Sequence, residues 1–458
     1  MQGDVLGPLV SSNMVDKNIG RAAIETENIY MYKGKVEIPP LTMQDDTLSI
    51  SECGFKTNKM NTFLNTHTKL MNLQFGSDKC SKMHIGKHIN RDICPQLSVE
   101  AWENEIVQDE GTNTLKDTYI GNIFMQTLSE KKYLGDIISD NGTNKANIRE
   151  RTNRATGTVN KILTILCEGP RGKHYFKAAK LMREAMLVNG MLGNSESWIN
   201  ITQKDIEDLD KPDTILKRKI LSLSGNPSKC FMFLELGILP VKYVLMKKRM
   251  QFLHYILNEN IDSMIVQVYN ALKEDHRKGD FVQLTNLDRQ DLDIELTDED
   301  IQTIPKMTWK KYIKEKVNTL ALEDLNFQNS GKEKTKNIVF SEIKMSKYLE
   351  KNENTELSKI LFSVRSRTLD VKEWLPWNYT DNICIACKKC EETMNHLMVC
   401  DSYKNEACVD WKNVFDDNLN DIFIIGKQIQ KRHIERKRLL ESEAGQALDP
   451  DSTAPGDS

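Results

Sequence analysis

A helical hydrophobic period through residues 144–366 is the feature that most constrains how this chain folds. Ile148, Val159, Ile162 and Leu166 lie along one stripe of a helix, since they recur at helical spacing. The same period continues in four further segments, 175–192, 206–223, 239–257 and 309–322. Because amphipathic helices must bury their apolar stripes against one another, this part of the chain is predicted to be a helical bundle.

The regions on either side of this bundle have a different character. Before residue 139, short strand-like runs alternate with Gly, Pro and Asn, and one helix is expected at 9–28, which favours an α+β region. Turn residues at 169–170, 225–227 and 329–331 separate the bundle helices. A compact Cys/His segment follows the bundle, then a basic helix around 427–438. The final residues, 441–458, are rich in Ser, Asp, Gly and Pro and are predicted to be disordered.

The Cys/His segment has the spacing of a zinc site, Cys384-x2-Cys387-x8-His396-x3-Cys400. The first two cysteines can form a knuckle that presents both thiolates to one ion, and His396 and Cys400 share one face of a short helix. All four positions are filled by protein, so we expect a structural rather than a catalytic Zn²⁺. Cys390 is a spare thiol that could replace Cys387, and a set of buried free cysteines is the alternative.

Charge and composition indicate the surroundings of the protein. The net charge of -3 identifies no partner, but residues 144–183 hold a dense group of Lys and Arg, as nucleic-acid binding requires. The ten cysteines in 458 residues do not form a disulfide scaffold, which predicts a reducing compartment. With no run of apolar residues long enough for a membrane span and no signal-peptide core, the predicted location is nuclear and/or cytoplasmic, without membrane partners.

Two adjacent carboxylates, Asp45 and Asp46, lie between short runs that can pair as a hairpin. At the tip of a tight turn they repel each other unless a divalent cation such as Mg²⁺ neutralises them. Polymerases use paired carboxylates in this way to activate a 3′ hydroxyl and stabilise the departing pyrophosphate. In isolation, an Asp-Asp turn is more often a solvated turn or a helix cap.

Three further motifs flank the Met43-Gln44-Asp45-Asp46 segment in a fixed order. They are Gln2-Gly3-Asp4-Val5-Leu6-Gly7-Pro8, the lysine-bearing segment at 73–86, and Lys131-Lys132-Tyr133-Leu134-Gly135-Asp136-Ile137-Ile138. In this order the four motifs resemble the reverse transcriptases of non-LTR retrotransposons, which are RNA-directed DNA polymerases.

The resemblance implies a role for each motif. Asp45 and Asp46 would be catalytic Mg²⁺ ligands, and Lys79 would donate a proton to pyrophosphate, with Lys82 as a competing candidate. Gln2 and Gly3 would approach the nascent base pair. The segment with Lys132, Tyr133, Leu134 and Gly135 would be the primer-grip turn.

The resemblance also divides the chain. It implies a partial palm (1–139), thumb-like helices (140–225), a helical connector (226–366), a CCHC zinc module (367–405), a basic helix (406–440) and the tail (441–458). Template RNA and DNA would be the partners. The nucleic-acid contacts would come from the primer-grip turn together with the basic residues Arg149, Arg151, Arg154, Lys161, Lys173 and Lys177.

Two departures from the family pattern stand out. Met43 occupies a position where many family members have an aromatic residue, which we interpret as a subfamily difference. The family's first catalytic aspartate lies upstream of the Gln-Gly motif, and this sequence starts at Met1. Without that ligand the two-metal site is incomplete, so we expect a weakened Mg²⁺ site and an inactive polymerase, with nucleotides as substrates only if the missing part is supplied.

Several interpretations stay open from the sequence. The chain could be a non-catalytic, zinc-containing nucleic-acid-binding protein derived from such an element, or a decayed reading frame. Basic and aromatic residues before the zinc segment could bind phosphates and stack bases, or pack the module onto the bundle: Arg365, Arg367, Trp374, Trp377 and Tyr379. The stripe Met246, Met250, Phe252, Leu253 and Ile256 is predicted to be bundle core. The run 431–438 is either a nuclear-import or nucleic-acid patch or, more commonly, a solvated helix face.

Overall fold

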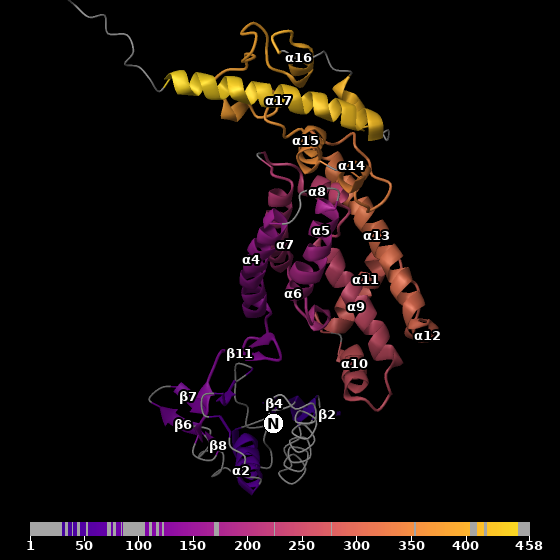
Figure 1. Ribbon diagram of the computed structural model, residues 1–458. Helices are drawn as coiled ribbons and strands as arrows, with labels where there is room; N and C mark the ends of the chain where they lie inside the picture. The colour runs from indigo at the N-terminus through magenta and orange to yellow at the C-terminus, as the bar shows by residue number, and fades with distance from the viewer. Residues whose placement is uncertain are drawn as a thin grey trace, which may run out of the picture.

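Over the residues that it describes, the computed structural model is mostly helical, with few strands. It describes residues 30–32, 35–38, 40–43, 46–51, 54–70, 75–76, 79–83, 85, 106–109, 112–115, 119–120, 123–168, 174–223, 225–275, 277–351, 354–403, 410–415 and 419–447. Figure 1 shows an elongated helical body with the N-terminal strands at one end and the long C-terminal helix across the other. The predicted helix at 9–28 and the turn at 169–170 lie outside the described residues.

The N-terminal region contains short strands and one long helix, α2 (Gly54–Leu70). The strands are β1 (Tyr30–Tyr32), β2 (Val36–Ile38), β3 (Leu41–Met43), β4 (Asp46–Leu48), β5 (Ser81–Lys82), β6 (Ile106–Asp109), β7 (Thr112–Leu115), β8 (Tyr119–Ile120), β9 (Ile123–Phe124), β10 (Gln126–Thr127), β11 (Glu130–Tyr133) and β12 (Asp136–Ser139).

These strands pair two at a time, in the described part of the chain. Five pairs are antiparallel hairpins of consecutive strands, and β5 pairs in parallel with β10. Met60 and Leu64 of α2 pack on Ile120 in a small core of their own. The α+β character predicted for this region is therefore present, as hairpins beside a helix rather than as one continuous sheet.

The predicted bundle helices are confirmed, with shifted ends. The helices are α4 (Lys145–Glu168), α5 (Tyr175–Met182), α6 (Asn189–Met191), α7 (Gln203–Ile220), α8 (Lys229–Leu236), α9 (Val241–Asn258), α10 (Met264–Asp275), α11 (Phe281–Asp291), α12 (Asp298–Thr303), α13 (Lys306–Ser330), α14 (Lys347–Lys351), α15 (Thr355–Arg365), α16 (Met394–Val399) and α17 (Leu419–Ala447). A π-helical segment, Arg183–Val188, joins α5 to α6.

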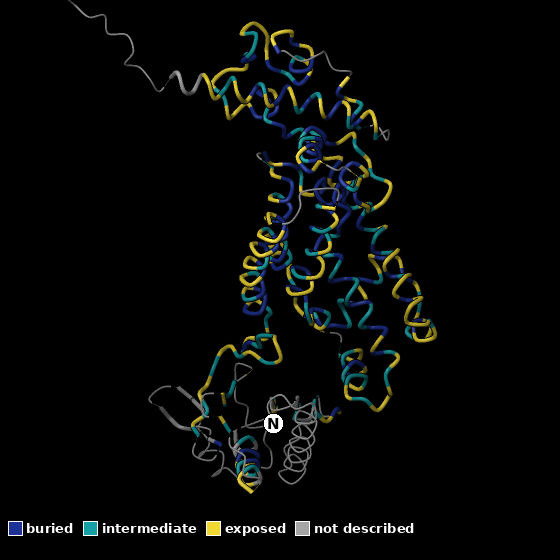
Figure 2. Tube along the Cα trace, in the orientation of Figure 1, coloured by how far each residue is buried: buried dark blue, intermediate teal, exposed yellow. Residues whose placement is uncertain are grey.

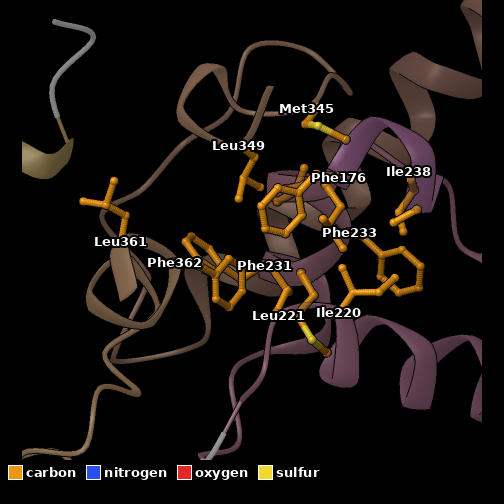
Figure 3. Packing of buried hydrophobic residues seen from close by; sticks show 14 of the residues in the cluster. Phe176, Ile220, Leu221, Phe231, Phe233, Ile238, Met345, Leu349, Leu361 and Phe362 are labelled. Carbon is orange, nitrogen blue, oxygen red and sulfur yellow. The ribbon is translucent and has the colours of Figure 1, made fainter. Parts of the chain in front are cut away.

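One hydrophobic cluster extends from Ile148 on α4 to Ile429 on α17. Figure 3 shows its centre, where Phe231 of α8 lies beside Phe362 of α15. The segments predicted as thumb-like helices, helical connector and zinc module all contribute residues to this cluster, so they share a single core. This sharing follows from contacts between residues far apart in sequence, which helical periodicity alone does not reveal.

A second cluster lies between α9 and α13. It confirms the predicted core stripe, since Met246, Met250, Leu253 and Ile256 are buried there with Trp309, while Phe252 is half-buried. The indole nitrogen of Trp309 donates to the carbonyl of Met250 at 2.9 Å, which satisfies the polar atom of a fully buried ring.

Buried ion pairs connect the helices of the body. Arg183 and Lys217 both contact the fully buried carboxylate of Asp213, at 2.6 and 3.0 Å. Arg365 donates to Glu235 at 2.7 Å, which ties α15 to α8. Such pairs stabilise one arrangement because removing one partner leaves an uncompensated charge in the interior.

Helix α17 continues to Ala447, so residues 441–447, predicted to be disordered, are helical. The helix extends because Glu441 to Ala447 contains no helix-breaking residue other than Gly445.

Within the described residues, none of the helices has the length and apolar character to cross a membrane.

Candidate metal centre and nucleic-acid interface

The first half of the metal centre is a tight knuckle around Cys384 and Cys387. The Cys384 amide donates to the Cys390 carbonyl at 2.8 Å, and the Lys388 amide donates back to the Cys384 carbonyl at 3.0 Å. Lys388 adopts a positive φ of 56°, which turns the chain sharply after Cys387. The knuckle brings the two sulfurs together, as the Cys-x2-Cys spacing predicts.

The second half of the centre is the short helix α16. Thr393 caps it by accepting a hydrogen bond from the His396 amide at 3.0 Å, and the Cys400 amide donates to the His396 carbonyl at 2.8 Å. This turn places the His396 ring and the Cys400 sulfur on the side that faces the knuckle.

The four side chains meet as a compact set. One ligand atom from each of Cys384, Cys387, His396 and Cys400 lies within 4.8 Å of all the others, and Cys387 Sγ is 3.3 Å from His396 Nε2. Tetrahedral Zn²⁺, with bonds of about 2.0–2.3 Å, needs ligand atoms roughly 3.3–3.8 Å apart, so a small contraction completes the site. Cys390 is exposed and lies outside the set, so of these two thiols Cys387 is the candidate ligand.

The local environment shifts the pKa values of the two knuckle thiols, Cys384 and Cys387, in opposite directions. Burial raises the pKa of Cys384 to about 11. Burial also opposes ionisation of Cys387, but hydrogen bonds from the backbone of Lys389 and Cys390 and from His396 outweigh it and lower its pKa to about 6. One thiolate is therefore available at neutral pH, and a bound dication would favour ionisation of the others.

Helix α17 holds the centre against the body, beside α16 in Figure 1. Arg432 donates to the carbonyls of Leu397 and Cys400 at 2.9 and 3.2 Å, and Arg436 donates to Glu392 at 2.8 Å. Arg432, His433 and Arg436 are buried, so the interpretation of this basic run as a solvated face is wrong for these three. Their helical spacing from Ile425 and Ile429, both buried, is the sequence pattern that could have revealed this.

The basic and aromatic residues before the knuckle fall into two groups. Arg365 is buried against Glu235 and donates to the Val414 carbonyl at 2.7 Å; Trp374 packs edge-on against Trp411. The Tyr379 hydroxyl donates to Asp370 at 2.6 Å. Arg365 and Trp374 are therefore buried, and Trp374 belongs to the core that the bundle shares, while the Tyr379 hydroxyl is bonded within its own segment.

Arg367 and Trp377 differ from that group. Arg367 is half-buried, and Trp377 is 68% exposed.

The Asp-Asp segment forms the predicted hairpin. Strands β3 and β4 pair in antiparallel fashion, with Met43 opposite Asp46. Asp45 lies outside the described residues, as do Gln2 and Gly3, and the side chain of Asp46 is not described.

The two lysines after this hairpin have different environments. Lys79 is exposed in a turn, and its carbonyl accepts from Lys131 at 3.0 Å. Lys82, its competitor, is half-buried in β5.

The primer-grip-like segment forms the hairpin β11–β12. Leu134 and Gly135 make its turn, with φ of 48° and 92°, values typical of a type I′ hairpin. Lys132 is exposed on β11. The Tyr133 hydroxyl donates to the Leu41 carbonyl at 3.3 Å, so this hairpin meets the Asp-Asp hairpin across 92 residues of sequence.

The basic helix residues that were predicted to contact nucleic acid differ in how far they are exposed. Arg149 and Arg154 are exposed and pair with Glu130 and Glu150, at 2.9 and 2.6 Å. Lys161 is exposed, Lys177 pairs with Glu350 at 3.1 Å, and Lys173 lies outside the described residues.

Arg151 does not fit the prediction that it contacts nucleic acid. It is buried, forms an ion pair with Asp136 at 2.6 Å, and donates to the Asn147 side chain and to the carbonyls of Gly190 and Met191. Its guanidinium joins β12, α4 and α6. It lies on the buried stripe with Ile148 and Ala155, which the helical period could have indicated.

The fold and site define a mostly helical protein with a Cys/His centre that could hold a metal such as zinc. Comparisons of the chain with protein-family models, with curated proteins and with solved structures found no match.

Proposed function

We propose that this chain is part of a retroelement reverse transcriptase, that it binds a template–primer duplex, and that Asp45 and Asp46 contribute to a Mg²⁺ site. The contact between the Tyr133 hydroxyl and the Leu41 carbonyl carries this proposal. It joins the hairpin that resembles the catalytic turn to the hairpin that resembles the primer grip. Both motifs would act on the primer end, so the proposal requires them to be neighbours.

The exposed face of α4 supports a duplex partner. Ala155, Val159 and Ile162 are buried on one side of α4, and Arg149, Arg154 and Lys161 are exposed. Figure 2 shows that α4 has both buried and exposed stretches. The ion pairs of Arg149 and Arg154 are exposed and worth at most about 1 kcal/mol each, so phosphates can replace their carboxylate partners at little cost. A helix that begins just after the primer-grip-like hairpin would extend these contacts along the duplex.

Duplex binding is tested with a labelled RNA–DNA hybrid and fluorescence anisotropy. Lys161→Glu should weaken binding and lower the slope of log K against log salt by about 0.9, the value for one phosphate contact. Lys310→Glu is the matched control, because Lys310 is an exposed lysine on α13. Equal affinities for the hybrid in the parent protein and the Lys161→Glu variant would contradict the proposal.

A second candidate is a zinc-containing protein that binds nucleic acid without catalysis. This candidate is favoured by the set of Cys384, Cys387, His396 and Cys400, which is packed against α17. A structural metal centre of this kind can support binding without any catalytic residue. Primer extension on an RNA template with Mg²⁺ separates the two. Extension that disappears in Asp45→Ala with Asp46→Ala supports the polymerase; a protein that binds the hybrid and never extends it supports the second candidate.

A further inference from the structure

A surface between the bundle and the zinc centre brings an exposed tryptophan together with two cations. Lys334 lies in the loop after α13, Arg367 follows α15, and Trp377 lies on the short turn Pro376–Asn378. The Lys334 ammonium is 5.5 Å from the centre of the Trp377 ring. We name this set the Trp377 surface.

The position of Lys334 is set by hydrogen bonds to backbone carbonyls rather than by a carboxylate. Its ammonium donates to the carbonyl of Trp374 at 3.0 Å and to that of Arg367 at 3.4 Å. Burial and the charge of Arg367 lower the pKa of Lys334. In the described part of the chain neither cation has a carboxylate in ion-pair contact, so an anion that bound between them would relieve their repulsion.

Arg367 adopts a backbone conformation that favours glycine. It has a φ of 51° and occupies the position just past the end of α15 where helices usually have glycine. The Thr368 amide donates to the Ser363 carbonyl at 2.7 Å and the Arg367 amide to Val364 at 3.0 Å, which completes the helix-ending motif. An arginine there costs backbone strain of about 1 kcal/mol, and glycine would form the same motif without it.

Trp377 is held rigidly while its ring stays open to solvent. The Asn378 amide donates to the Leu375 carbonyl at 3.0 Å and the Tyr379 amide to Pro376 at 3.2 Å. The neighbouring side chains, Leu375 and Tyr379, point into the fold. A large aromatic ring that is 68% exposed on a fixed turn buries little apolar area, so packing does not explain it.

We propose that Trp377, Lys334 and Arg367 form a binding site for single-stranded nucleic acid, with a base stacked on Trp377 and the adjoining phosphodiester bound by the two cations. A flat ring beside fixed positive charges matches a partner that alternates planar bases with phosphates. A duplex presents stacked, inaccessible bases and would leave the indole unused. The site does not depend on the polymerase resemblance.

The test measures binding of a labelled oligothymidylate of about 12 nucleotides to the full chain with zinc bound. Trp377→Ala should weaken binding by roughly 5- to 100-fold, and Trp377→Phe should restore part of it. Quenching of tryptophan fluorescence by the oligonucleotide should be smaller in Trp377→Phe. Lys310→Ala, an exposed lysine elsewhere, should bind like the parent protein.

Arg367→Gly separates a binding role from a structural one. It should weaken binding and lower the salt slope by about 0.7, the value for one phosphate contact on a single strand. Its melting temperature should equal or exceed that of the parent protein, because glycine adopts this φ freely. An unchanged affinity in both Trp377→Ala and Arg367→Gly overturns the proposal, and so does a parent protein that binds no oligonucleotide.

Two competitor probes identify the partner. Polyphosphate has the charge without bases, so Trp377→Ala should leave its binding unchanged; an equal loss would overturn base stacking. Polyglutamate that competed as strongly as the oligonucleotide would overturn the nucleic-acid assignment in favour of an acidic protein. Lys161→Glu should spare oligothymidylate binding, so failure of the duplex proposal and failure of this one are distinguishable.

Discussion

Charge removal at the Glu392–Arg436 pair should uncouple α17 from the metal centre. Both side chains are 0% exposed, and Arg436 Nε lies 2.8 Å from Glu392 Oε1. At an effective dielectric of about 20 the direct attraction is about 6 kcal/mol, part of which offsets the cost of desolvating both charges. Glu392→Gln keeps the volume and the acceptor for the Lys372 amide, and among the described carboxylates in ion-pair contact it leaves Arg436 with Asp370, 3.7 Å away.

We expect Glu392→Gln and Arg436→Met each to lower the free energy of unfolding by about 3–5 kcal/mol. The double variant should cost no more than either single one, because an uncharged amide tolerates the loss of Arg436 better than a buried carboxylate does. Urea denaturation at saturating zinc, followed by helical circular dichroism, measures all four proteins.

The control is the exposed pair Glu150–Arg154, where Glu150→Gln should change the free energy of unfolding by less than about 0.5 kcal/mol. Losses below about 1 kcal/mol in both single variants, or a double variant whose loss equals their sum, would refute the argument that this pair acts as a buried unit.

Three further predictions follow. The purified protein should hold about one tightly bound zinc; Cys400→Ser should lose it and melt earlier, whereas Cys390→Ser, at an exposed thiol outside the set, should retain it in metal analysis. Burial and the neighbouring Lys437 and Arg436 lower the pKa of His433 from 6.5 to about 4, so the unfolded chain takes up a proton first as pH falls. Stability should therefore decline by about 2–3 kcal/mol from pH 6.5 to 4, and this decline should shrink in His433→Leu in urea titrations at several pH values. Gly237→Ala, at a φ of 58° where a Cβ would overlap the backbone, should unfold at much lower urea, whereas Gly157→Ala on the exposed side of α4 should raise stability by about 0.5–1 kcal/mol.

Local rules of spacing determined several features directly from the sequence. The Cys/His set follows from residue intervals because a knuckle and one helical turn fix where four nearby side chains point. The bundle helices follow from the 3.6-residue period, and the hairpin at Leu41–Met43 and Asp46–Leu48 from two short runs around a polar turn. The choice of Cys387 over Cys390 needed coordinates, since both spacings are chemically acceptable.

Only the tertiary structure decided what each basic residue does. Arg151, Arg365 and Arg436 have the same chemistry as the exposed Arg149, yet they are buried because carboxylates distant in sequence meet them: Asp136, Glu235 and Glu392. A charged side chain can be buried in a core only where an oppositely charged partner and hydrogen bonds compensate for the loss of water. Sequence thus determined where positive charge is dense, and the packing of distant segments determined which arginines are buried and which stay exposed.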